Sequence, residues 1–95
     1  MNHPIFITDE TRDLLRSLPP VLKNKIRLAL GEIRQDPLCA KALIQELEGL
    51  RSYKLGMIRI IYRIDHASVR IVAIGPRHNI YEQVILEIKR SKKIH

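Results

Sequence analysis

The sequence has little cysteine, no tryptophan and no long hydrophobic run. Its one cysteine, Cys39, has no second thiol with which to form an internal disulfide, which favours a reducing compartment. The apolar stretch near the amino terminus is too short for a signal peptide, and no run approaches the ~20 residues of a membrane-spanning helix. These absences predict a cytoplasmic protein with no membrane partner.

Metal-ligating residues are sparse as well. The four histidines, His3, His66, His78 and His95, show none of the paired spacing that is typical of metal sites. We therefore expect no metal site and no small-molecule cofactor. A chain of 95 residues has room for one small hydrophobic core, so residues 1–95 are expected to form a single domain.

Acidic residues are under-represented in the second half of the chain. Residues 1–50 contain seven cations and seven acids, which cancel, whereas residues 51–95 contain ten cations and three acids. The whole net charge of +7 therefore belongs to the second half. Such asymmetry predicts a polyanionic partner, which can be a nucleic acid, an acidic protein, or both.

Two amphipathic helices are expected after a short first strand at His3–Ile7. Thr8 or Asp9 can cap the first helix, and a Pro-Pro pair then ends it and can open the second. The second helix should span residues 21 to about 35, because its apolar residues recur at helical spacing: Leu22, Ile26, Ala29, Leu30 and Ile33. The two helices should form a hairpin.

From residue 50 the apolar period changes to two, which predicts strands at Leu50–Lys54, Ile58–Asp65 and Val69–Gly75. Gly56 can supply the positive φ that a tight turn between the first two strands needs. After a cap at Asn79, a last helix is indicated by apolar residues at helical spacing: Ile80, Val84, Ile85 and Ile88.

The predicted fold class is α+β. A small antiparallel sheet of about four strands should be packed by the N-terminal helix hairpin and followed by a C-terminal helix, in the order β-α-α-β-β-β-α. The middle strand should turn one face to the core (Ile58, Ile60, Tyr62 and Ile64) and the other to a working surface (Arg59, Ile61 and Arg63).

Cations dominate this predicted sheet, and they suit contact with phosphate. Six lysines and arginines lie between residues 51 and 77, with Asp65 as the single acid: Arg51, Lys54, Arg59, Arg63, Arg70 and Arg77. Arg63 and Arg70 are interpreted as solvated strand residues. Tyr53 and Tyr62 are interpreted as packing residues, with stacking on an RNA base as the alternative for either.

Three segments of the chain together resemble the RelE/ParE superfamily, the toxins of type II toxin–antitoxin modules. They are Gly49–Gly56, Ile58–Asp65 and Ala73–Glu82, and the expected order of elements is also that of the superfamily. Resemblance to the RelE branch implies a ribosome-dependent endoribonuclease that cuts messenger RNA and so inhibits translation. The implied reaction is attack of a ribose 2′-hydroxyl on the adjacent phosphate, without a metal ion.

The resemblance also implies catalytic roles. Arg59 corresponds to a phosphate clamp, Arg77 to the arginine that protonates the leaving group or stabilises charge in the transition state, and Tyr81 to the general base. The phenol of tyrosine has an unperturbed pKa of about 10, so it can act as a base only if neighbouring cations favour its phenolate.

Three further residues are candidates for binding RNA phosphate. Lys54 is the better candidate for an auxiliary cation, while Arg51 can equally pair with Glu48. His78 has an unperturbed pKa suited to proton transfer and is an alternative to Tyr81, although a surface turn histidine is the simpler interpretation.

Two other functions remain open. Resemblance to the ParE branch implies an inhibitor of DNA gyrase, and a third reading is a degenerate toxin that binds only its antitoxin. For all three the resemblance implies an acidic, largely extended antitoxin that folds as it binds. We expect the antitoxin to cover the helix hairpin and approach the basic sheet. The ribosome and messenger RNA are the other partners implied by the RelE branch.

Overall fold

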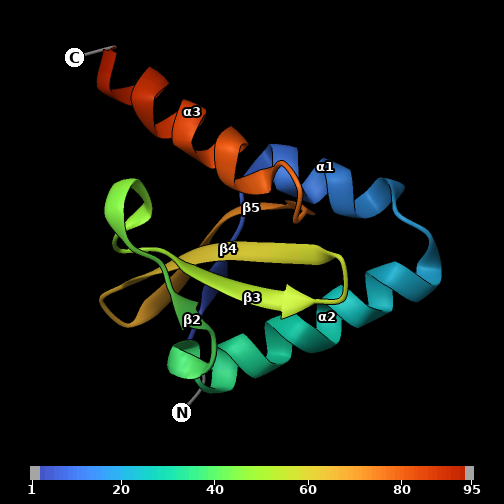
Figure 1. Ribbon diagram of the computed structural model, residues 1–95. Coiled ribbons are helices and arrows are strands. Elements are labelled where there is room, and N and C mark those ends of the chain that lie inside the picture. Colours follow the sequence, from blue (N-terminus) through green and yellow to red (C-terminus); the bar gives the residue numbers. More distant parts are fainter. Residues whose placement is uncertain (1–2, 94–95) are drawn as a thin grey trace.

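The computed structural model describes residues 3–93, which form a mixed sheet with helices on both of its faces (Figure 1). In chain order the elements are β1 (Ile5–Phe6), α1 (Asp9–Ser17), α2 (Pro20–Gln35), the 3-10 turn η1 (Pro37–Cys39), β2 (Lys41–Ala42), the 3-10 turn η2 (Gln45–Leu47), β3 (Arg51–Leu55), β4 (Ile58–Asp65), β5 (Ser68–Pro76) and α3 (Ile80–Lys93). The predicted α+β class and order of elements are confirmed.

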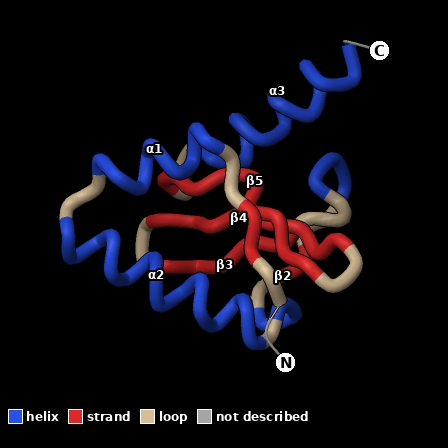
Figure 2. Tube along the Cα trace, turned by 180° about the vertical axis from the view of Figure 1, so that it is seen from behind, coloured by secondary structure: helices blue, strands red, loops and turns tan. Residues whose placement is uncertain are grey.

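The sheet has five strands in the order β1-β5-β4-β3-β2. Strand β1 runs parallel to β5, whereas the other neighbouring strands are antiparallel. The strands are drawn in red in Figure 2, with the helices in blue around them. The sequence predicts about four antiparallel strands, so the parallel pairing of β1 and the edge strand β2 are additions. Strand β2 is only two residues long, too short to show an apolar period.

The N-terminal helices begin and end where their polar and proline residues predict. Thr8 caps α1, since its hydroxyl accepts a hydrogen bond from the backbone N–H of Thr11 at 3.1 Å. Helix α2 begins at Pro20, ends before Asp36-Pro37, and buries Ile26, Ala29 and Ile33 on one stripe. The stripe predicted for α2 is therefore confirmed.

Two hydrophobic cores lie on opposite faces of the sheet. The larger core joins the buried stripe of α2 to Ile60, Tyr62 and Ile71 of the central strands. The smaller core joins Ile61 of β4 to α3 and η2, through Ile80, Val84, Leu47 and Leu50. The prediction that Ile61 belongs to an open working surface is therefore wrong, because α3 covers it and leaves it 0% exposed.

Two irregularities shape the central strands. Gly56 has φ +60° in the turn between β3 and β4, a backbone conformation that glycine adopts without steric cost. On β5 the pairing shifts so that Ala73 lies opposite Ile61 and Ile71 lies opposite Tyr62, which leaves Val72 as a bulge. Val72 and Ala73 then both face α3, and both contact its core.

Helix α3 begins with a weaker cap than its sequence predicts. The backbone carbonyl of Asn79 accepts a hydrogen bond from the N–H of Gln83 at 3.1 Å, as the cap position requires. Its side-chain Oδ1, however, is buried without a partner among the described residues. Within residues 3–93, neither α3 nor another helix combines the length and the apolar character needed to cross a membrane.

Candidate functional site

Several predicted site residues share one face of the sheet near the β3–β4 turn. Lys54 lies directly opposite Arg59, and Arg59 lies opposite Gly75. Residues opposite one another in an antiparallel pair project from the same face, with Cβ atoms about 5 Å apart. This is the face that α3 covers, because Ile61, two residues beyond Arg59, belongs to the core under that helix.

Tyr81 reaches this face from the first turn of α3. Its hydroxyl lies 2.8 Å from the hydroxyl of Ser52 on β3, with which it forms a hydrogen bond. Ser52 lies opposite Ile61, and its side chain therefore points toward α3. Ser52 is 7% exposed, so the bond is shielded from water at its strand end. The sequence analysis did not identify Ser52, and a lone strand serine carries no signal that could have done so.

Arg77 is tied to the β3–β4 turn by its backbone. Its N–H donates to the carbonyl oxygen of Met57 at 2.9 Å, so the turn that leads into α3 is held against the turn between β3 and β4. The side chains of Arg77 and His78 are exposed on this turn. The structure thus places Arg77 at the end of the sheet that also carries Arg59.

Gly75 lets α3 start close to the sheet. A Cβ atom at this position would lie 2.9 Å from Cδ1 of Ile80, closer than ordinary packing allows. Ile80 is 1% exposed, and its place in the core sets where the first turn of α3 lies. Glycine at position 75 therefore leaves room for the Ile80 side chain beneath the turn that carries Tyr81.

Arg59 differs from the expectation of an open phosphate clamp. The residue is 9% exposed, and its Nη1 donates to the carbonyl oxygens of Gly56 at 2.8 Å and Ile58 at 2.9 Å. Its guanidinium therefore braces the turn of its own hairpin. The positive charge still lies beside Lys54 at the end of the sheet that Arg77 joins.

Arg51 is not brought together with the other candidates. It lies opposite Tyr62, so it projects from the α2 face of the sheet. Its Nη1 donates to the carbonyl oxygen of Ala40 at 2.7 Å, where the sequence suggested an ion pair with Glu48. Strand alternation thus puts the side chain of Arg51 on the face of the sheet opposite to Tyr81.

The other two tyrosines are packing residues, as predicted. Tyr62 is fully buried, its hydroxyl donates to the carbonyl oxygen of Pro37 at 2.5 Å, and burial raises its pKa to about 12. Tyr53 contacts the larger core, and a hydrogen bond from its hydroxyl to Glu32 raises its pKa to about 12. Arg63 and Arg70 are exposed, as predicted, and Arg70 lies 3.9 Å from Asp65.

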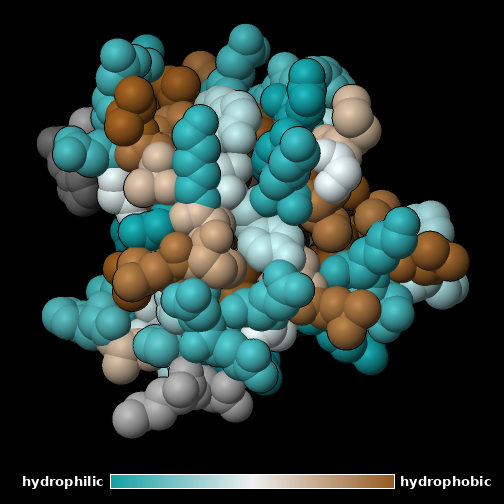
Figure 3. Space-filling model, turned by 60° about the horizontal axis from the view of Figure 1, so that its bottom comes forward, coloured by the Kyte–Doolittle hydropathy of each residue, from teal (hydrophilic) through white to brown (hydrophobic). Residues whose placement is uncertain are grey.

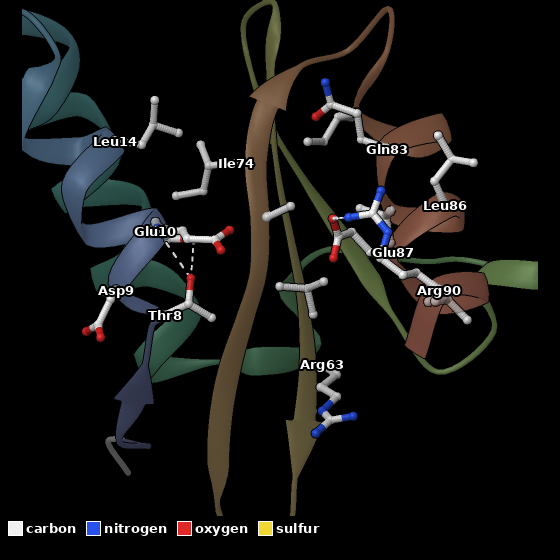
Figure 4. A pocket seen from close by; sticks show the side chains of 16 residues that line it. Thr8, Asp9, Glu10, Leu14, Arg63, Ile74, Gln83, Leu86, Glu87 and Arg90 are labelled. Carbon is white, nitrogen blue, oxygen red and sulfur yellow. Dashed lines mark hydrogen bonds and ion pairs between the residues drawn. The ribbon is translucent and has the colours of Figure 1, made fainter. Parts of the chain in front are cut away.

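Two hollows of the surface lie away from the candidate site residues. One, of about 1040 Å³, lies between α1 and α3, with Leu14 on one side and Leu86 on the other (Figure 4). A smaller one, of about 490 Å³, lies between α1 and α2. Neither is lined by Lys54, Arg77 or His78, the candidates whose side chains are exposed. Among the described residues, no three histidine, cysteine or acidic side chains gather as metal ligands would.

The fold and this surface define a class: a small basic α+β protein that presents cations and a phenol at one end of its sheet. Residues 8–81 match the family described as ParE toxin of type II toxin-antitoxin system, parDE. Toxin RelG of Mycobacterium tuberculosis is 36% identical over 81 residues, which are 82% of this chain and 93% of that toxin. The chain belongs to the RelE/ParE superfamily of type II toxin–antitoxin toxins, as its sequence motifs predicted.

Solved structures show the same fold. The toxin–antitoxin complex RelBE2 from Mycobacterium tuberculosis contains a chain that is 33% identical, with a TM-score of 0.69 over 81% of this chain and 100% of that one. A mutant of the E. coli toxin RelE in the free state is 18% identical, with a TM-score of 0.72 over 95% of this chain and 98% of that one. Because its identity to this chain is only 18%, the similarity to E. coli RelE supports the fold alone.

Proposed function

We propose that this toxin is a metal-independent endoribonuclease that cleaves messenger RNA on the ribosome and thereby inhibits translation. The observation that carries the proposal is the convergence of Lys54, Arg59 and Tyr81 on one face of the sheet, with Arg77 joined to the same end by a backbone hydrogen bond. Cations beside a phenol suit a reaction in which a proton leaves a hydroxyl and charge develops on a phosphate.

The proposed reaction is a transfer within the RNA strand. Tyr81, as its phenolate, takes the proton of a ribose 2′-hydroxyl, and the 2′-oxygen forms a bond to the adjacent phosphorus. Arg77 and Lys54 stabilise the negative charge of the phosphorane. The bond from phosphorus to the 5′-oxygen then breaks, and that oxygen takes up a proton, for which Arg77 is the proposed donor.

An open site fits a reaction in which a large partner supplies the geometry. In this proposal the ribosome holds the message in place, so the toxin contributes few groups of its own. His78, exposed beside Arg77, is the proposed alternative for proton transfer and a further phosphate contact. Arg59 acts mainly as a brace for the hairpin that carries Lys54, and its buried charge adds to the local positive potential.

Purified toxin incubated with programmed ribosomes tests this function. Mapping of the message ends should show cuts that depend on ribosomes and disappear in Arg77→Ala. The family description that matches this chain names ParE, so gyrase inhibition is the second candidate function. Intact message together with loss of supercoiling by gyrase would support that candidate. If the message stays intact and gyrase stays active, the remaining candidate is a toxin homologue that only binds its antitoxin.

The proposed partner is an acidic antitoxin, and the groove between α1 and α2 is where it would dock. Five cations line this groove, and no acidic residue does: Arg12, Arg16, Lys23, Arg27 and Arg34. Leu15, Ile26 and Leu30 form its apolar floor. On the face that Figure 3 brings forward, hydrophilic side chains likewise lie beside apolar patches. An acidic amphipathic helix complements both features.

A further inference from the structure

The hydrogen bond between Ser52 and Tyr81 joins residues 29 positions apart, and no step proposed above uses it. Among the described residues, the Tyr81 hydroxyl has this one hydrogen-bond partner. Ser52 lies in β3, which is paired on both sides, with Lys41 of β2 and Ile61 of β4. The serine hydroxyl is therefore attached to a rigid part of the sheet, whereas Tyr81 lies in the first turn of a terminal helix.

A tyrosine ring anchored at its Cα alone can rotate about its first side-chain torsion. Tyr81 is half-buried and packs against the smaller core, so packing restrains its ring only in part. A bond at the far end of the ring, from a side chain that is 7% exposed, removes that freedom. The phenol oxygen is then held against the strand that also carries Lys54.

We propose that Ser52 is a positioning residue, whose hydroxyl orients the Tyr81 phenol over the sheet and donates a hydrogen bond to its phenolate. This inference rests on the proposed function, in which Tyr81 is the base. A serine hydroxyl offers one donor and two acceptor positions, so it can serve the neutral phenol and the phenolate without moving. When the phenolate forms, serine becomes the donor of a charge-assisted bond, which is about twice as strong as a neutral one.

Other charged groups lie on the elements that pack together around Tyr81. They are Lys54 on β3, Arg59 on β4, Arg77 and His78 on the preceding turn, Glu82 in α3 itself, and Glu46 and Glu48 in and beside η2. A serine-to-alanine change at position 52 removes none of these charges. The difference between wild type and Ser52→Ala therefore isolates the contribution of the hydroxyl.

The first experiment is a titration that needs no ribosome. The absorbance of ionised tyrosine is followed with rising pH, and the step that disappears in Tyr81→Phe belongs to Tyr81. In Ser52→Ala that step should move up by about one pH unit, because the phenolate has lost a charge-assisted bond. Ser52→Thr, which keeps a hydroxyl, should restore the wild-type position, and Ser68→Ala, which loses a hydroxyl bonded to Asp65 in a distant turn, should not move the step.

The second experiment is the pH profile of ribosome-dependent cleavage. Below the pKa of the base, Ser52→Ala should cut about tenfold more slowly than wild type, and a rise of one pH unit should recover the loss. A merely structural role would lower the rate equally at every pH. Thermal unfolding of Ser52→Ala confirms that the variant is folded.

The two experiments separate the inference from the proposed function. A Tyr81 step that stays in place in Ser52→Ala overturns the inference, even if wild type cleaves message. A shifted step with restoration by Ser52→Thr supports the coupling of the two hydroxyls. If wild type then fails to cleave message, the proposed function fails while the coupling stands.

Discussion

Arg59→Ala should destabilise this toxin as well as impair its activity. The side chain is 9% exposed and donates to two carbonyl oxygens of the β3–β4 hairpin, those of Gly56 and Ile58. A hydrogen bond from a charged group contributes about 1.5–3 kcal/mol, and the carbonyls left behind lose their partner. Both bonds come from the same nitrogen, so we expect a total loss of about 2–4 kcal/mol.

For a domain of this size, each kcal/mol corresponds to about 4–8 °C in the melting temperature, so Arg59→Ala should melt about 8–32 °C below wild type. Thermal unfolding followed by circular dichroism measures this shift. Arg77→Ala is the matched control, because it removes an exposed arginine, and its melting temperature should stay close to that of wild type.

The activity of both variants is then compared well below their melting temperatures. In the folded state Arg77→Ala should lose more cleavage than Arg59→Ala, since the exposed guanidinium of Arg77 is the one free to reach RNA. Equal melting temperatures for the two variants would refute the reasoning, because they would mean that the buried guanidinium of Arg59 contributes no stability.

Two further predictions concern stability at high pH and the docking groove. The pKa of Tyr62 is about 12 in the folded chain and about 10 in an unfolded one, so the folded state keeps the Tyr62 proton up to a higher pH. The stabilisation from this proton should therefore be complete below pH ~10 and be lost between pH ~10 and ~12. Tyr62→Phe should flatten this decline and lower the free energy of unfolding at neutral pH by about 1–3 kcal/mol. Denaturant titrations at several pH values measure both effects. Reversal of two groove charges, in the double variant Arg27→Glu with Arg34→Glu, should weaken the binding of an acidic amphipathic peptide at least tenfold, as measured by calorimetry. Lys25→Glu, which changes an exposed residue away from the groove, is the control. An equal loss of affinity in that control would mean that net charge, and not the groove, determines binding.

Most elements of this fold could be predicted because their signals are local. A threonine cap, a Pro-Pro break and an apolar stripe define α1 and α2, and the structure reproduces them. Gly56 with period-two residues on either side defines the β3–β4 hairpin. The pairing of β1 with β5 could not be read in this way, because it joins residues about sixty positions apart through only two residue pairs.

The candidate site was predictable as a set of residues but not as an arrangement. Alternation along β4 placed Arg59 and Ile61 on one face, yet alternation does not say whether that face is open. In the structure the apolar side of α3 packs on that face and buries Ile61, so the face that was expected to be open is covered. The same alternation put Arg51 on the far face, away from Tyr81.

The sequence by itself determined the helices, the central strands, the excess of positive charge and the superfamily, because each depends on residue type and short-range spacing. Only the tertiary structure decided that Arg59 turns inward to its own hairpin, that α3 closes the second face of the sheet, and that Ser52 holds Tyr81. These outcomes depend on which side chains meet after distant segments pack together, and the free energy of such contacts is not encoded in any one segment of the chain.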